Sequence, residues 1–276
     1  MKKLLSFLLA ATMSTMLFGL DIFTYAPLVG NVKTYTQTDF EVTTKFGNYF
    51  RTPRAKYVHV LNALGQEIET RELSAKDEII NKAVFKYDAS GNVIEYAYYN
   101  ASSKLLWKVS TTWKNGKKVD SSEYDKNNVL KAKIIYTYTD DKLTDESGYN
   151  GDGTLNFKII YKYNNKGLVE KQFTYNSDGS LDTEETITYT ENSKIESRTK
   201  FDAYTKEITS DVFRYAQNGT LSEITTYNSE KKIIKRITIK YDTNGNAAKV
   251  SEYIVSEKFG STQNDLVNIT EYIYKE

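Results

Sequence analysis

The sequence predicts an all-β protein, a long antiparallel β-meander built from tandem hairpin repeats. Aromatic anchors recur along most of the 276 residues, with steps that alternate between 14 and 12 or 11 residues. Each anchor precedes a polar turn and then an aliphatic residue. The chain holds 23 Tyr and only 2 Pro, which favours strands because Pro cannot donate to a ladder. A period of 25–26 residues is one hairpin and predicts about 15–17 strands in a twisted or curled sheet.

Residues 149–175 form one complete repeat. Gly153 follows Tyr149 by four residues and Leu155 follows it by six, which is typical of a type I turn closed by a glycine in the left-handed region. This geometry predicts that Tyr149 faces Leu155. The same turn and anchor positions are predicted at Tyr87, Gly91, Tyr149, Gly153, Tyr163, Gly167, Tyr175, Gly179, Tyr215, Gly219, Tyr241 and Gly245.

Two steps of 11 residues are explained by loops that are one residue shorter. Asn115-Gly116 and Asp140-Asp141 suit two-residue hairpin loops. The shortening keeps the inward and outward alternation of the strands, so Tyr138 is expected to pair with Leu143.

Residues 1–26 are predicted to be a secretory signal peptide. Lys2 and Lys3 precede the apolar run LLSFLLAATMSTMLFG, which is too short for a comfortable transmembrane helix. Cleavage is expected after Gly19 or Ala26, and Pro27 argues against the second site. The chain has no Cys, which excludes a lipoprotein anchor and disulfides. We therefore expect an exported protein that is periplasmic, on the cell surface or secreted.

Residues 27–60 are less regular and are interpreted as N-terminal cap strands, because repeat arrays need ends that cover an open edge. Residues 61–276 are interpreted as the hairpin repeat domain, which forms a single domain with the cap. The segment EKFGSTQNDL interrupts the rhythm before the last strand, LVNITEYIY.

The predicted strands differ in polarity. After the 14-residue steps, Leu155, Phe157 and Ile159 share one face. A transmembrane barrel needs an uninterrupted lipid-facing belt, and a sandwich needs an apolar contribution from every strand. A banded face favours a long antiparallel meander, twisted or curled, with no transmembrane span. The strands after the 12-residue steps are expected to place charges on that same face, at Glu95, Lys171, Glu223 and Lys249.

The motifs YDASGN at 87–92 and YDTNGN at 241–246 resemble the tyrosine-aspartate repeats of Rhs proteins and teneurins. The resemblance covers roughly residues 61–253, and the whole chain is similar to secreted and cell-surface Bacteroidales proteins with tandem tyrosine-rich hairpins, mostly of unknown function. The match to bacterial MORN repeats is weaker. Rhs proteins enclose a toxin in a repeat shell, but no toxin segment is recognised here. The resemblance therefore implies a fold and transfers no functional residue.

Composition and motifs argue against several classes of function. Without Lys2 and Lys3 the chain has 35 basic and 36 acidic residues, so no basic face for nucleic acid or anionic lipid is expected. His59 is the only His, and it is expected to be a strand residue with a local hydrogen bond. Segments 150–153 and 242–246 resemble calcium loops but occupy turn positions. We expect no metal, no cofactor and no enzymatic activity.

Tyrosines outside the anchor positions are the candidate ligand surface, because the hairpin pairing already explains the anchors. The preferred hypothesis is an exported, non-enzymatic structural or interaction protein that presents a repetitive sheet surface to a protein partner. The alternative is a glycan-binding module, because exposed aromatic rings stack on sugars. The candidate residues are Tyr96, Tyr98, Tyr136 and Tyr161.

Overall fold

The computed structural model describes residues 22–45, 48–258 and 260–276. This part of the chain contains one short helix, α1 (Ile22–Tyr25), and a single 18-stranded sheet. The strands are β1 (Thr34–Lys45), β2 (Asn48–Leu61), β3 (Glu67–Leu73), β4 (Ile79–Tyr87), β5 (Val93–Asn100), β6 (Leu105–Lys114), β7 (Lys117–Asp125), β8 (Leu130–Thr139), β9 (Lys142–Asn150), β10 (Leu155–Tyr163), β11 (Val169–Asn176), β12 (Leu181–Tyr189), β13 (Ile195–Asp202), β14 (Ile208–Tyr215), β15 (Leu221–Tyr227), β16 (Ile233–Tyr241), β17 (Ala247–Lys258) and β18 (Ser261–Lys275).

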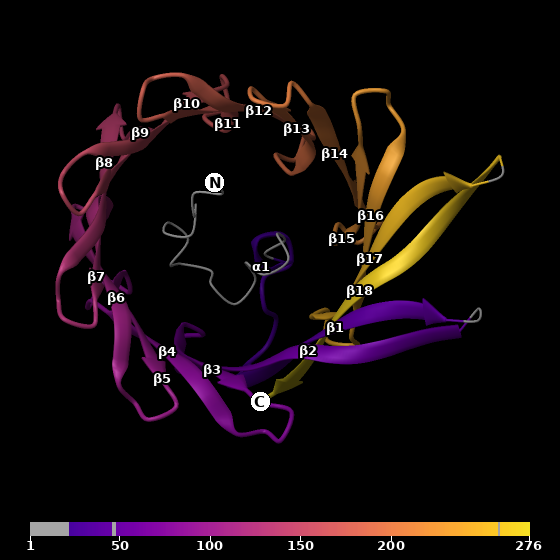
Figure 1. Ribbon diagram of the computed structural model, residues 1–276, viewed down its shortest axis with the longest axis horizontal. Helices are drawn as coiled ribbons and strands as arrows, with labels where there is room; N and C mark the ends of the chain where they lie inside the picture. Colours follow the sequence, from indigo (N-terminus) through magenta and orange to yellow (C-terminus); the bar gives the residue numbers. More distant parts are fainter. Residues whose placement is uncertain (1–21, 46–47, 259) are drawn as a thin grey trace.

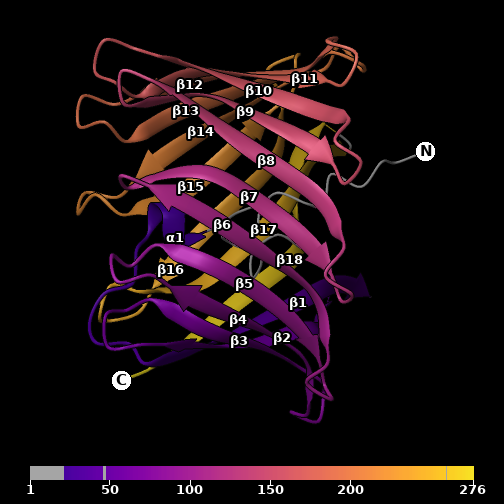
Figure 2. The ribbon, with the colours of Figure 1, turned by 90° about the vertical axis from the view of Figure 1, so that its left-hand side faces the viewer.

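The sheet closes on itself. Consecutive strands pair antiparallel, and β1 also pairs with β18 from Thr34 opposite Lys275 to Glu41 opposite Asn268. Figure 1 shows the resulting barrel in end view, and Figure 2 shows its strands inclined to the barrel axis. The expected open, twisted or curled meander of 15–17 strands is therefore wrong. Residues 34–61 supply β1 and β2, and closure pairs backbone groups that an open sheet would leave exposed at its two edges.

The hairpin loops follow the turn chemistry of the sequence. Tyr149 pairs with Leu155, as expected. Gly153 has a φ of +84°, and its N–H donates to the carbonyl oxygen of Asn150 over 2.9 Å. The Asn150 N–H donates in turn to the carbonyl oxygen of Thr154 over 2.9 Å. The type I turn with a left-handed glycine is confirmed at this loop.

The two shorter loops are also confirmed. Both loop residues have positive φ in each case, 53° and 73° at Asn115 and Gly116, and 48° and 65° at Asp140 and Asp141. Positive φ at both positions defines the type I′ turn, whose twist matches that of the flanking strands. The pairing expected across the second loop is present, between Tyr138 and Leu143.

The assignment of charged residues to the apolar face is wrong. After Tyr163 pairs with Val169, the ladder resumes with Lys162 opposite Lys171. The second strand thus contains one extra residue, a β-bulge, and a shift of one residue moves every following side chain to the other face. The charged residues that were expected on the apolar face lie on the opposite face of the sheet. They are Glu95, Lys171, Glu223 and Lys249.

Helix α1 identifies which face of the sheet points inward. It lies within the ring of strands (Figure 1). The Phe23 ring is centred 5.2 Å from that of Tyr35 and 5.5 Å from that of Tyr272, and the Tyr25 ring is 5.3 Å from that of Phe213. These side chains from β1, β14 and β18 therefore point into the barrel. Alternation along each strand and the register between strands extend this inward face around the barrel.

The main apolar core lies where α1 meets the inner faces of β14–β18, β1 and β2. Ile22 is wholly buried there, with Leu221 and Ile224 in the same cluster. The chain between α1 and β1 is held by Asn246, whose side chain accepts from the Val29 N–H over 2.7 Å and donates to its carbonyl oxygen over 3.0 Å. The expected signal peptide, residues 1–26, lies outside the described residues except for 22–26.

Two long hairpins project from the barrel where it closes. The pairing of β1 with β18 ends at Glu41, whereas β1 continues with β2 to Lys45 opposite Asn48. Likewise, β17 and β18 remain paired to Lys258 opposite Ser261. Figure 1 shows the two hairpins diverging outward beyond the wall.

Candidate functional site

All four tyrosines proposed as a ligand surface point into the barrel. Tyr96 and Tyr98 lie on β5, Tyr136 on β8 and Tyr161 on β10. The register carries the inward face from strand to strand, beginning at His59, whose ring stacks on that of Tyr35. The cross-strand neighbours along this path are His59 and Thr70, Thr70 and Ala83, Ala83 and Tyr98, Tyr98 and Trp107, Val109 and Glu123, Glu123 and Ala132, Tyr136 and Glu146, and Glu146 and Ile159. We call the inward-facing residues of β3–β10 the inner wall.

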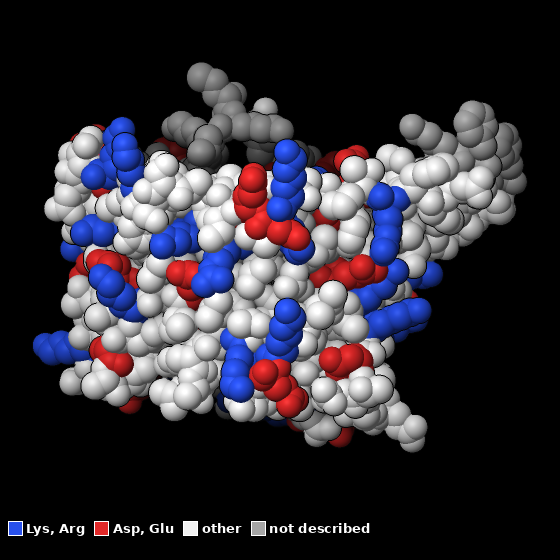
Figure 3. All heavy atoms as spheres, turned by 90° about the horizontal axis from the view of Figure 1, so that it is seen from below, with Lys and Arg blue, Asp and Glu red and all other residues white. Residues whose placement is uncertain are grey.

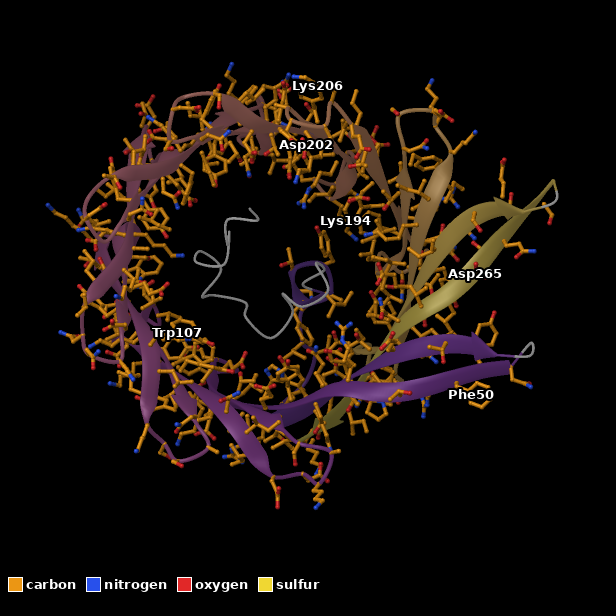
Figure 4. The ribbon with its side chains drawn as sticks, in the orientation of Figure 1. Phe50, Trp107, Lys194, Asp202, Lys206 and Asp265 are labelled. Carbon is orange, nitrogen blue, oxygen red and sulfur yellow. The ribbon has the colours of Figure 1, made fainter. Side chains whose placement is uncertain are left out.

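An aromatic cluster forms one part of the inner wall. The Tyr96 ring is centred 4.9 Å from that of Phe85 and 5.3 Å from that of Trp107, and the Tyr98 ring is 5.6 Å from that of Trp107. These are the tilted and edge-on arrangements that aromatic pairs prefer. Figure 4 shows Trp107 on the inner side of the ribbon. Tyr96 is only 3% exposed, so it is not the exposed residue that the sequence suggested, whereas Tyr98 and Trp107 are half-buried.

Carboxylates orient the tyrosine hydroxyls of this wall. The Tyr98 hydroxyl donates to Glu72 over 3.2 Å, and the Tyr161 hydroxyl donates to Glu146 over 2.9 Å. Tyr136 donates to the hydroxyl of Ser121 over 3.3 Å. Burial and then the neighbouring carboxylate raise the pKa of Tyr98 and of Tyr161, and burial raises the pKa of Tyr136 to about 12. The three hydroxyls therefore remain protonated donors at neutral pH.

Glu123 is a buried carboxyl group in an apolar part of the inner wall. It lies on β7 between Val109 of β6 and Ala132 of β8 and is 6% exposed. Within the described part of the chain its carboxyl group has no hydrogen bond or ion pair. Burial raises its pKa to about 7. Sequence reasoning missed Glu123, because the face of its strand can be assigned only when the preceding bulges are known.

One ammonium group reaches the inner wall from the start of β7. The Nζ of Lys118 stands 5.6 Å from the ring centres of both Trp113 and Tyr136, a cation–π arrangement. Its charge also lowers the pKa of Glu146, although burial raises that pKa more strongly. Carboxylates on the inner wall include Glu67, Glu72, Glu123 and Glu146.

The inner faces of β12–β14 carry charges of both signs in addition to aromatic rings such as that of Phe213. The Nε of Arg198 lies 3.8 Å from a carboxylate oxygen of Glu185, and Asp211 accepts from the Thr226 hydroxyl over 2.6 Å. In Figure 4, Asp202 lies toward the inside of the ring and Lys206 toward the outside. Aromatic rings and carboxylates are combined on the arc β3–β10.

His59 is a structural residue at the edge of this arc. It is wholly buried, its ring is centred 4.2 Å from that of Tyr35, and its Nδ1 lies 2.7 Å from a carboxylate oxygen of Glu67. The local hydrogen bond expected for His59 is confirmed. Asp242, in one of the calcium-like loops, accepts the backbone N–H of Asn244 and Asn246 over 2.9 and 2.8 Å, which is the role of a turn residue.

The outer wall carries paired charges across neighbouring strands, together with exposed apolar side chains such as Leu106 and Ile135. Lys86 pairs with Glu95 at 2.7 Å and Lys171 with Glu184 at 2.8 Å. Figure 3 shows basic and acidic side chains interspersed over the lower face of the barrel. Charges mixed in this way create no strong field of one sign. Among the described residues, no helix has the length and apolar character needed to cross a membrane.

No family model and no curated protein matches this sequence. Among solved structures, a porin-like protein from Bacteroides uniformis matches 90% of this chain and 99% of its own, with 10% identity and a TM-score of 0.49. A porin-like protein from Bacteroides vulgatus matches 77% and 98%, with 11% identity and a TM-score of 0.39. TcdB2-TccC3 without its hypervariable C-terminal region matches 88% of this chain and 16% of its own, with 11% identity and a TM-score of 0.34. The inner wall is therefore interpreted from its own geometry.

Proposed function

We propose that this protein is an exported, non-enzymatic binding protein that holds a glycan against the inner wall of the barrel. The observation that carries the proposal is the half-buried pair of rings of Tyr98 and Trp107, 5.6 Å apart, beside a hydroxyl fixed by Glu72. Sugars offer apolar ring faces and a periphery of hydroxyl groups. A site that combines aromatic faces with oriented carboxylates matches both kinds of surface.

Because the candidate tyrosines point into the barrel, a glycan ligand is favoured over the protein partner that was preferred from the sequence. In the closed barrel the four candidate tyrosines point inward, and the outer wall carries dispersed ion pairs such as Lys86 with Glu95. Exposed ion pairs of this kind contribute little binding energy. The polar groups on the inner wall also favour a hydroxylated ligand over an acyl chain, because burying a carboxylate against hydrocarbon without a hydrogen bond is costly.

A glycan array probed with the purified exported protein tests the proposal. We expect saturable binding to one class of sugar and its loss in Trp107→Ala or Tyr98→Ser. Tyr204→Ala is the matched control, because Tyr204 is 92% exposed in a turn and its loss should leave binding unchanged. A folded protein that binds no glycan, or binding that survives both inner-wall changes, would overturn the proposal.

A further inference from the structure

We propose that the glycan held by the inner wall carries a positively charged nitrogen, and that Glu123 and the neighbouring aromatic rings form the binding site for this group. The inference rests on the proposed function and specifies the class of sugar, an amino sugar with its nitrogen in cationic form. It depends on the position of Glu123, its lack of a partner and the charge of its surroundings.

The position of Glu123 places its carboxyl group beside the aromatic cluster. Glu123 is opposite Val109, and Val109 is opposite Tyr96 on the next strand. Trp107 lies two residues before Val109 on the same inward face, which makes it a diagonal neighbour of Glu123. Such diagonal positions are about 7–8 Å apart at the backbone, within reach of long and aromatic side chains.

The Glu123 carboxyl group is available to a ligand, because it has no protein partner among the described residues. Apart from Glu123, the inward carboxylates of this wall have protein donors, such as Tyr98 for Glu72 and Tyr161 for Glu146. An ionised carboxylate away from water is stable only beside a positive charge or several donors. A cationic nitrogen satisfies it and is also attracted by the faces of aromatic rings.

The wall already shows this kind of recognition with one of its own side chains. The ammonium group of Lys118 stands over the rings of Trp113 and Tyr136, and its charge acts on Glu146. Aromatic rings with a nearby carboxylate thus accommodate a cation on this surface. The site at Trp107 and Glu123 has the same two elements.

The groups that face Glu123 leave its charge uncompensated. On β6 the inward residues beside it are Trp107, Val109 and Thr111, and on β8 they are Ala132, Ile134 and Tyr136. None of these carries a charge at neutral pH. On its own strand Asp125 is engaged by the turn N–H groups of Asn127 and Val129 and by Lys131, which keep its pKa low. A bound cation would thus be the main positive charge close to the Glu123 carboxylate, and it would favour the ionised form.

Two sugars with the same backbone, one with a neutral and one with a cationic nitrogen substituent, test the inference. Isothermal titration at pH 8 compares the neutral trimer of N-acetylglucosamine with the N,N,N-trimethylglucosamine trimer, whose charge does not depend on pH. We expect at least tenfold tighter binding of the cationic trimer. Glu123→Gln should remove this preference, and Glu184→Gln on the outer wall should have no effect on it. Circular dichroism checks that each variant is folded.

The outcomes separate the two proposals. Equal binding of both trimers, or a cation preference that persists in folded Glu123→Gln, overturns the inference and leaves the proposed function intact. If neither trimer binds and the wider array is also blank, both proposals fail. For the cationic trimer, affinity should also increase about tenfold between pH 6 and pH 8, because a carboxyl group with a pKa near 7 becomes ionised over this range.

Discussion

The hydroxyl of Tyr163 lies 2.7 Å from the carbonyl oxygen of Leu143, twenty residues earlier on the preceding strand. The same contact is made by six aromatic anchors along this end of the barrel, which both pair across their own turn and tie it to the preceding strand. The ring has to carry a donor at its far end, which explains Tyr or Trp here. The other members are Tyr87 to Glu67, Trp113 to Val93, Tyr189 to Val169, Tyr215 to Ile195 and Tyr241 to Leu221.

Replacing Tyr163 by Phe tests this contact. The change removes one hydrogen bond and keeps the ring, so we expect the free energy of unfolding in urea to fall by about 1 kcal/mol. Tyr175→Phe is the control, because Tyr175 is an anchor at the other end of the barrel whose hydroxyl has no hydrogen bond among the described residues. Equal losses in the two variants would contradict the role given to the Tyr163 hydroxyl.

The turn glycines make a prediction about backbone conformation. A Cβ on Gly153 would meet nothing within 4 Å, but its φ is +84°, so Gly153→Val should be destabilised by about 1 kcal/mol or more through the backbone alone. Lys231 has a φ of 60° in the equivalent position of another turn. Lys231→Gly should therefore raise the melting temperature, and a fall would show that the side chain contributes more than the conformation costs.

The raised pKa of Glu123 predicts that the free energy of unfolding depends on pH. Its pKa is raised from 4.5 to about 7 in the folded protein, so between these values the folded state binds more protons than the unfolded state. The stability contribution of this group is therefore present at pH 4 and is lost as the pH rises through 7. At pH 8 the penalty is about 3 kcal/mol. In denaturant titrations Glu123→Gln should exceed the native protein in stability at pH 8 by an amount that shrinks toward pH 4, and a constant difference would contradict the assignment.

The burial of Ile22, the first residue of α1, predicts where the expected signal peptide is cleaved. Ile22 is wholly buried against Leu221 and Ile224, so we expect processing after Gly19 and not after Ala26, which N-terminal sequencing of the exported protein would reveal. Ile22→Ala should lower stability by about 2–5 kcal/mol, as for other large buried side chains. An exported chain that starts at Pro27 and remains fully stable would contradict this prediction.

Local features of the fold could be predicted from sequence, but features that depend on more than one hairpin could not. The loops at Gly153 and at Asn115-Gly116 follow from turn chemistry within five residues. The β-bulge after each three-residue loop adds one residue to the second strand of the hairpin. A prediction that leaves out this residue assigns Lys171 to the wrong face of the sheet. Closure depends on Thr34 meeting Lys275, and no local pattern encodes that encounter. The candidate tyrosines could be chosen from sequence because they lie outside the anchor positions, whereas the position of Glu123 can be assigned only when the register is known.

The pairing of β1 with β18 has a consequence for the time course of folding. Residues 34–41 can pair with residues 268–275 only after the rest of the sheet has formed. The last contacts therefore join segments separated by almost the whole chain. Contacts of such high sequence separation form slowly, and until β1 and β18 meet each of them is paired on one side only. During that interval each edge is a template for another molecule. The rate of this last step, relative to the rate of encounter between chains, will decide how much of the protein folds and how much aggregates.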